Sequence, residues 1–115
     1  MRRPTTAVAA VGLLLALTAC QSGAASGKVQ GTDAELACAA VSRLPERMPG
    51  AYGGQDFDIV VARLGGAEEL ARAAALADAK FQPLADALRE AQQLLNVTSD
   101  PPQAEPAIKK ARTYC

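Results

Sequence analysis

The chain contains no histidine and no tryptophan, and it has only two phenylalanines and two tyrosines among its 115 residues. Because imidazole is missing, catalytic triads and metal motifs that require histidine are excluded. So few aromatic rings offer little surface for stacking on nucleic acid bases. The 12 basic and 12 acidic side chains balance, so the total charge gives no reason to expect nucleic acid as a partner. We therefore expect neither an enzyme nor a nucleic-acid-binding protein, and we expect no cofactor and no metal.

The first 20 residues have the features of a secretory signal. Arg2 and Arg3 form a basic start, and residues 7–17 form an apolar run. Small residues then lead to Cys20. A helix needs about 20 apolar residues to cross a bilayer, so this run is too short to be a transmembrane anchor.

The segment Leu17-Thr18-Ala19-Cys20 resembles the lipobox of bacterial lipoproteins, in which a diacylglyceryl group is attached to the cysteine thiol. The resemblance implies cleavage before Cys20, lipidation of Cys20, and a position at the cell membrane on its extracytoplasmic side. It covers only this first segment, and an ordinary secretory signal followed by a chance cysteine is the alternative.

The chain has three cysteines, and an odd number in a secreted protein needs an explanation. Lipidation of Cys20 would leave Cys38 and Cys115 as an even pair in an oxidising compartment. We therefore expect a disulfide between Cys38 and Cys115. Because it would close a long loop, the chain-entropy model gives it a contribution of about 4–5 kcal/mol to stability.

The composition divides the chain into three segments. Residues 1–19 are the expected signal peptide, 20–32 the lipidated cysteine with a flexible, polar tether, and 33–115 a helical domain. A tether of this length spans roughly 20 Å on average, which would hold the domain close to the lipid surface. Without Arg2 and Arg3, the mature chain has two more acidic than basic side chains.

The domain is predicted to be all-α, a small bundle of about four helices, because apolar residues recur at helical spacing and no pair of strands is visible. Thr32 and Glu35 form a capping box, which begins a first helix that ends before Pro45. Residues 45–55 contain two prolines and three glycines and are expected to form a loop.

A short second helix is expected over about 57–64, with Asp56 as its N-cap and Gly65-Gly66 as its end. The run Ile59-Val60-Val61 could instead form a strand, but no second strand is present to pair with it.

The last helix is expected to begin near Pro106 and to reach Tyr114. The residues that share one side of it are Ala104, Ile108, Ala111 and Cys115. This spacing predicts that Cys115 faces the core, within reach of Cys38 on the rim of the first helix.

The longest pattern is a heptad stripe, formed by Leu70, Ala74, Ala77, Phe81, Leu84, Leu88, Ala91 and Leu95. The stripe keeps its phase across Pro83, and no capping residue stands at positions 80–82. It predicts either one long kinked helix over about 67–96 or two nearly collinear helices. Such a stripe is usually a core seam, and the alternative is a surface for an envelope protein partner or a homodimer.

Candidate ligand contacts are confined to the 49–58 loop, where Tyr52, Asp56 and Asp58 stand close together. The two aspartates resemble a fragment of a calcium loop, but its other ligands are missing and helix capping explains both. The basic residues Lys109, Lys110 and Arg112 are expected to complement the carboxyl end of the last helix, and the alternative is contact with anionic lipid headgroups. The sequence thus predicts a non-enzymatic interaction or structural lipoprotein of the cell envelope, or alternatively a small-molecule or ion-binding lipoprotein that uses this loop.

Overall fold

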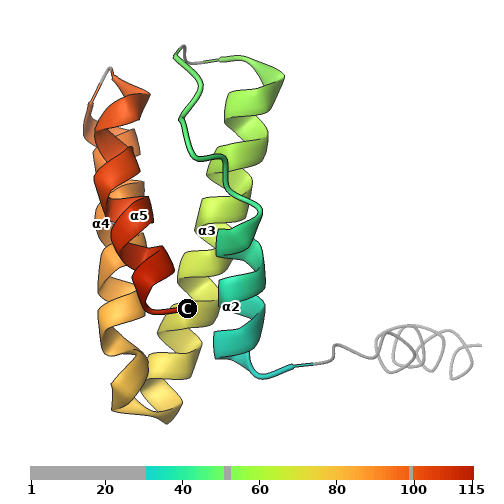
Figure 1. Cartoon of the computed structure of the whole chain (residues 1–115), viewed down its shortest axis with the longest axis vertical. Coiled ribbons are helices and arrows are strands. Elements are labelled where there is room, and N and C mark those ends of the chain that lie inside the picture. Colours follow the sequence, from blue (N-terminus) through green and yellow to red (C-terminus); the bar gives the residue numbers. More distant parts are fainter. Residues whose placement is uncertain (1–30, 51–52, 99) are drawn as a thin grey trace, which may run out of the picture. The chain divides into compact units, whose positions relative to one another are not determined.

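The computed structural model describes residues 31–50, 53–98 and 100–115, which belong to one compact unit (Figure 1). These residues contain no strand, and the expected all-α bundle of about four helices is confirmed. The α-helices are α2 (Asp33–Ser42), α3 (Gln55–Ala77), α4 (Gln82–Val97) and α5 (Glu105–Thr113). Two short 3-10 helices precede α4 and α5, η1 (Ala79–Phe81) and η2 (Pro101–Ala104). The expected signal peptide, Cys20 and Tyr52 lie outside the described residues.

Helix α2 begins where the capping box places it. The Glu35 backbone N–H donates to Thr32 Oγ1 at 3.3 Å, and the Thr32 N–H donates to the Glu35 carboxylate at 2.7 Å. A cap of this kind typically contributes about 1 kcal/mol. The helix ends at Ser42, and the described part of the following segment is irregular, as its prolines and glycines predict.

Helix α3 is much longer than the expected second helix. Its N-cap is Gly54 rather than Asp56, and it continues through Gly65-Gly66 to Ala77. The reason is an apolar face that keeps its phase across the glycines, with buried Phe57, Val60, Leu64, Ala67, Ala71 and Ala74. Two interior glycines cost about 1 kcal/mol each, and burial of this face outweighs that cost.

The expected long helix over 67–96 is wrong in both of its forms. The chain leaves the helix at Asp78, passes through η1 and turns back, so that α3 and α4 lie side by side and antiparallel (Figure 1). Asp78 caps η1, because its side chain accepts the Lys80 backbone N–H at 3.1 Å. Pro83 then lies in the first turn of α4, where its missing N–H costs no helical hydrogen bond.

The core lies where the four helices meet. Helix α2 packs against α3, α3 against α4, and α5 against α4 and α2. Eleven of the 21 buried hydrophobic side chains are alanines, which allow close approach of helices but bury little area each. The largest fully buried side chains include Leu64 of α3 and Leu84 and Leu88 of α4.

Candidate functional site

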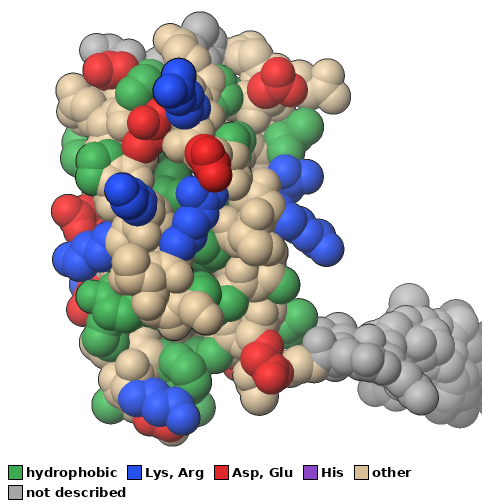
Figure 2. All heavy atoms as spheres, viewed as in Figure 1, with side chains coloured by type: hydrophobic (Ala, Val, Ile, Leu, Met, Phe, Trp, Pro, Cys, Tyr) green, Lys and Arg blue, Asp and Glu red, His purple; other side chains and the backbone are tan. Residues whose placement is uncertain are grey.

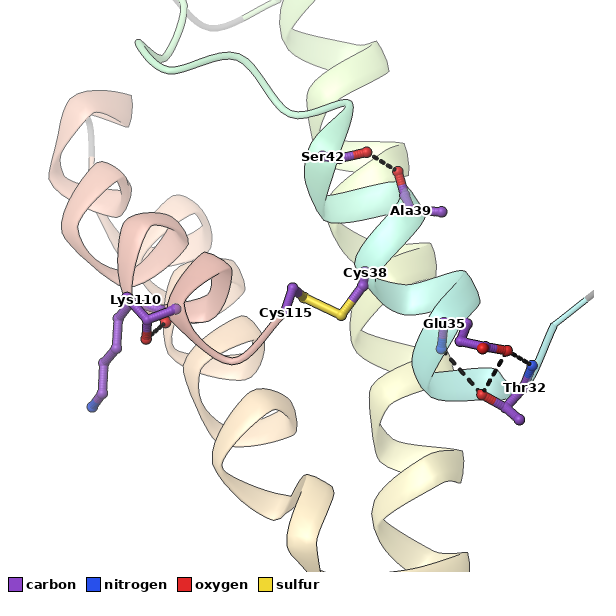
Figure 3. The surroundings of a disulfide bond; sticks show 8 residues. Thr32, Glu35, Cys38, Ala39, Ser42, Lys110 and Cys115 are labelled. Carbon is purple, nitrogen blue, oxygen red and sulfur yellow. Dashed lines mark hydrogen bonds between the residues drawn. A yellow bond between two sulfur atoms is a disulfide. The ribbon is translucent and has the colours of Figure 1, made fainter.

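A disulfide joins the first helix of the bundle to the last residue of the chain (Figure 3). The Cα atoms of Cys38 and Cys115 are 5.5 Å apart, which is within the usual range for this bond. Cys38 is half-buried and packs against the core, as its position on the rim of the apolar face of α2 predicts.

Cys115 does not face the core as expected, because it is exposed. The helical spacing that suggested a buried position breaks down at the end of the chain, since α5 ends at Thr113 and Tyr114 is its C-cap. Ala104, Ile108 and Ala111 are buried as predicted. The bond therefore lies at the surface of the bundle.

Helix α5 also holds the segment that follows α2. Arg112 donates to the carbonyl oxygens of Leu44 and Pro45, at 2.6 and 3.3 Å, and Glu105 accepts the Met48 backbone N–H at 2.8 Å. Glu105 and Arg112 are seven residues apart, so they project from the same face of α5. These contacts fix the 44–48 segment against α5, a role for Arg112 that the sequence analysis missed.

On its other side, the same segment forms a cleft with the first half of α3, which we call the arginine cleft. Its volume is about 460 Å³. Three basic side chains and one acidic side chain line it, namely Arg43, Arg47, Arg63 and Asp56. The remaining lining residues are apolar, namely Pro45, Met48, Pro49, Ile59 and Val60. Arg63 donates to the Arg43 carbonyl at 3.2 Å, which links α3 to the end of α2 beside the cleft.

The three arginines of the cleft have no ion-pair partner among the described residues. The ion pairs found there are formed elsewhere, by Arg72 with Glu69, Lys80 with Asp78, and Arg89 with Asp86. Figure 2 shows basic side chains that project at the edge where the end of α2 meets the first half of α3. The cleft is therefore a local concentration of positive charge with an apolar floor.

The structure divides the residues that the sequence analysis grouped as a ligand loop. Both aspartates are exposed, but Asp56 lines the arginine cleft and Asp58 does not. Both lie in the first turn of α3, where the helix dipole favours acidic residues. Within the described ranges, no group of three or more metal-ligating side chains comes together. The arginines that dominate the cleft were not predicted, because Arg63 lies 16 positions after Arg47 and only the fold brings it to the segment that carries Arg43 and Arg47.

The heptad stripe is divided between α3 and α4. Its buried members are Ala74, Leu84, Leu88, Ala91 and Leu95. Leu70 and Phe81 are half-buried, and Ala77 is exposed at the end of α3. Most of the stripe is thus a seam inside the bundle and offers no continuous outer surface.

In the part of the chain that the structure describes, no helix has both the length and the apolar character needed to span a bilayer. Comparison of the chain with protein-family models, curated proteins and solved structures finds no match.

Proposed function

We propose that the chain is a lipoprotein, anchored by a lipid on Cys20 at the extracytoplasmic face of the cell membrane. Its helical domain acts there as a non-enzymatic binding or structural module of the cell envelope. The lack of histidine in the sequence supports a role without catalysis.

The observation that carries this proposal is the distribution of the three cysteines. Cys38 and Cys115 are bonded to each other, and disulfides persist mainly in oxidising compartments outside the cytoplasm. This pairing leaves Cys20 for the lipid, directly after a basic and apolar segment and within a motif that resembles a lipobox.

Expression of the whole chain in a bacterium that processes lipoproteins tests the anchor. We expect the intact mass of the detergent-extracted protein to equal residues 20–115 plus a diacylglyceryl group, with the protein in the membrane fraction. The Cys20→Ser variant should lose the lipid and leave the membrane fraction. The Cys38→Ser variant is the matched control and should keep the lipid. An unmodified Cys20 in the wild-type protein would overturn the proposal.

Two kinds of binding partner are proposed for the domain. The first is an envelope protein or a second copy of the chain, which would have to use exposed side chains, because most of the heptad stripe is buried. Crosslinking on intact membranes tests this, since a reproducible heterologous or self-crosslink identifies the partner. The second is a small molecule or ion, and the arginine cleft favours it.

A further inference from the structure

We propose that the arginine cleft binds an organic phosphate. The proposal rests on the binding role given above and assigns it a ligand class. The ligand is a phosphate monoester whose phosphate contacts Arg43, Arg47 and Arg63 and whose apolar part lies on Met48 and Val60.

The charge of the cleft matches this ligand. Three guanidinium groups and the Asp56 carboxylate leave an excess of two positive charges, in a mature chain that is acidic as a whole. A phosphate monoester carries about −1.5 to −2 charges at neutral pH, whereas a carboxylate carries one. Guanidinium groups also match phosphate oxygens with paired hydrogen bonds. Arg72 and Arg89 are neutralised by the carboxylates of Glu69 and Asp86. The three arginines of the cleft have no such partner among the described residues, although Arg63, like Arg112, also donates to a backbone carbonyl.

The shape of the cleft fits an organic ligand better than a bare ion. Its volume of about 460 Å³ lies in the range of small-molecule sites. Met48 and Val60 are 5% and 4% exposed, so they form a firm apolar floor, and Ile59 on the rim is 39% exposed. An ester group placed on this floor would cover mainly the exposed surface of Ile59, because Met48 and Val60 have little contact with water.

The walls of the cleft are held in place before any ligand arrives. Glu105 and Arg112 of α5 hold the 44–48 segment by hydrogen bonds to its backbone. The hydrogen bond from Arg63 to the Arg43 carbonyl joins α3 to the end of α2. Because this backbone is already ordered, binding costs conformational entropy chiefly at the exposed Arg43 and Arg47 side chains.

The test uses the oxidised chain from residue 21, which contains the whole helical unit with its core and its disulfide. Phenyl phosphate is titrated and binding is followed by the melting temperature and by NMR. We expect a rise in melting temperature and shifts of the Ile59 and Val60 methyl signals. Inorganic phosphate should bind more weakly because it lacks the apolar part, and benzoate should bind more weakly because of its single charge.

Matched variants distinguish binding by the arginines of the cleft from a general effect of the protein's total charge. Arg63→Gln should weaken phenyl phosphate binding about tenfold, the loss expected for one charge-assisted hydrogen bond. The triple variant R43Q/R47Q/R63Q should abolish binding. The control triple R72Q/R89Q/K110Q removes the same charge from other exposed positions and should bind like the wild type. Equal losses in the two triple variants, or no binding of phenyl phosphate by the wild type, would overturn the proposal.

Vesicles distinguish a lipid headgroup from a soluble phosphate. Cosedimentation with vesicles that contain phosphatidic acid, lost in the cleft triple variant, would assign the phosphate to a lipid. Binding of phenyl phosphate without cosedimentation would assign it to a soluble molecule. Binding of an aspartate-rich peptide without any binding of phosphate would overturn the proposal in favour of an acidic protein partner. Because this chain carries no lipid, failure here leaves the test of Cys20 unaffected.

Discussion

Asp78 is the residue at which the chain leaves α3 and turns towards α4. Its pKa is lowered from the ordinary value of 3.8, chiefly by the hydrogen bond that the Lys80 backbone N–H donates to the carboxylate. Desolvation opposes this shift, and the hydrogen bond and charge of the Lys80 side chain add to the lowering. A carboxyl whose pKa is lower in the folded chain stabilises the fold above its unfolded pKa. This stabilisation is lost as the pH falls through the folded pKa.

The Asp78→Asn variant tests the charge of this cap. We expect a lower melting temperature than the wild type at pH 7, with a difference that disappears in acid, where Asp78 is protonated as well. Asp100→Asn is the matched control, because Asp100 is the N-cap of η2 and makes no side-chain capping hydrogen bond. A difference for D78N that is the same at every pH would contradict the role of the charge.

At the scale of elements, the capping box and the prolines placed the first and last helices, whereas the bounds of α3 and the start of α4 were not predicted. The Thr32–Glu35 capping box was correct because both of its hydrogen bonds are local. Gly65-Gly66 did not end a helix, because the packed face of α3 continues beyond it. Asp78 was missed because it caps an intervening 3-10 turn two positions before the place where a cap for α4 was sought.

Helix α3 should become more stable when its two interior glycines are replaced. A Cβ at Gly66 would meet nothing within 4 Å, and one at Gly65 would meet Gln92 Nε2 at an ordinary 3.6 Å. We expect G65A/G66A to raise the free energy of unfolding by about 1–2 kcal/mol, since alanine is the better helix former by about 1 kcal/mol per site. Urea denaturation measures the difference.

The Gly53→Ala variant is the control, because its free energy of unfolding is expected to change in the opposite direction. Gly53 has φ of +81°, a conformation that strains any residue with a Cβ. The variant should therefore lose stability. If G65A/G66A also lost stability, the glycines would have a role that the packing around them does not explain.

At the scale of the whole molecule, the fold class and the cysteine pairing followed from the sequence, but the cleft did not. The periodicity of apolar residues predicts the helical class, and once Cys20 is assigned to a lipid the two remaining cysteines can pair in only one way. The cleft depends on where the 43–49 segment lies, and Glu105 and Arg112 set that position through hydrogen bonds to residues 57 and 68 positions away in the chain. Contacts between residues so far apart produce no local sequence pattern from which the cleft could be predicted.

The contribution of the disulfide to stability is also a property of the whole molecule. A core built largely of alanines buries little area, so hydrophobic stabilisation is modest and a long-range crosslink has a large share in the total. Cys38 and Cys115 are 77 positions apart, and the chain-entropy model gives about 4–5 kcal/mol for a loop of that size. We expect reduction of the disulfide in the chain from residue 21 to lower the free energy of unfolding by about 4–5 kcal/mol, and so to lower the urea concentration at the midpoint. Urea denaturation with and without a reductant measures the change.

The variant C38S/C115S makes this prediction independent of the reductant. It should match the reduced wild type, and addition of reductant should leave it unchanged. The helical content of both should persist at low denaturant, because Cys115 is exposed and only the half-buried Cys38 packs against the core. A midpoint that did not move on reduction would mean that the unfolded chain is already compact, so that the crosslink removes little entropy from it. The alanine-rich core would then have to hold the bundle together without help from the bond.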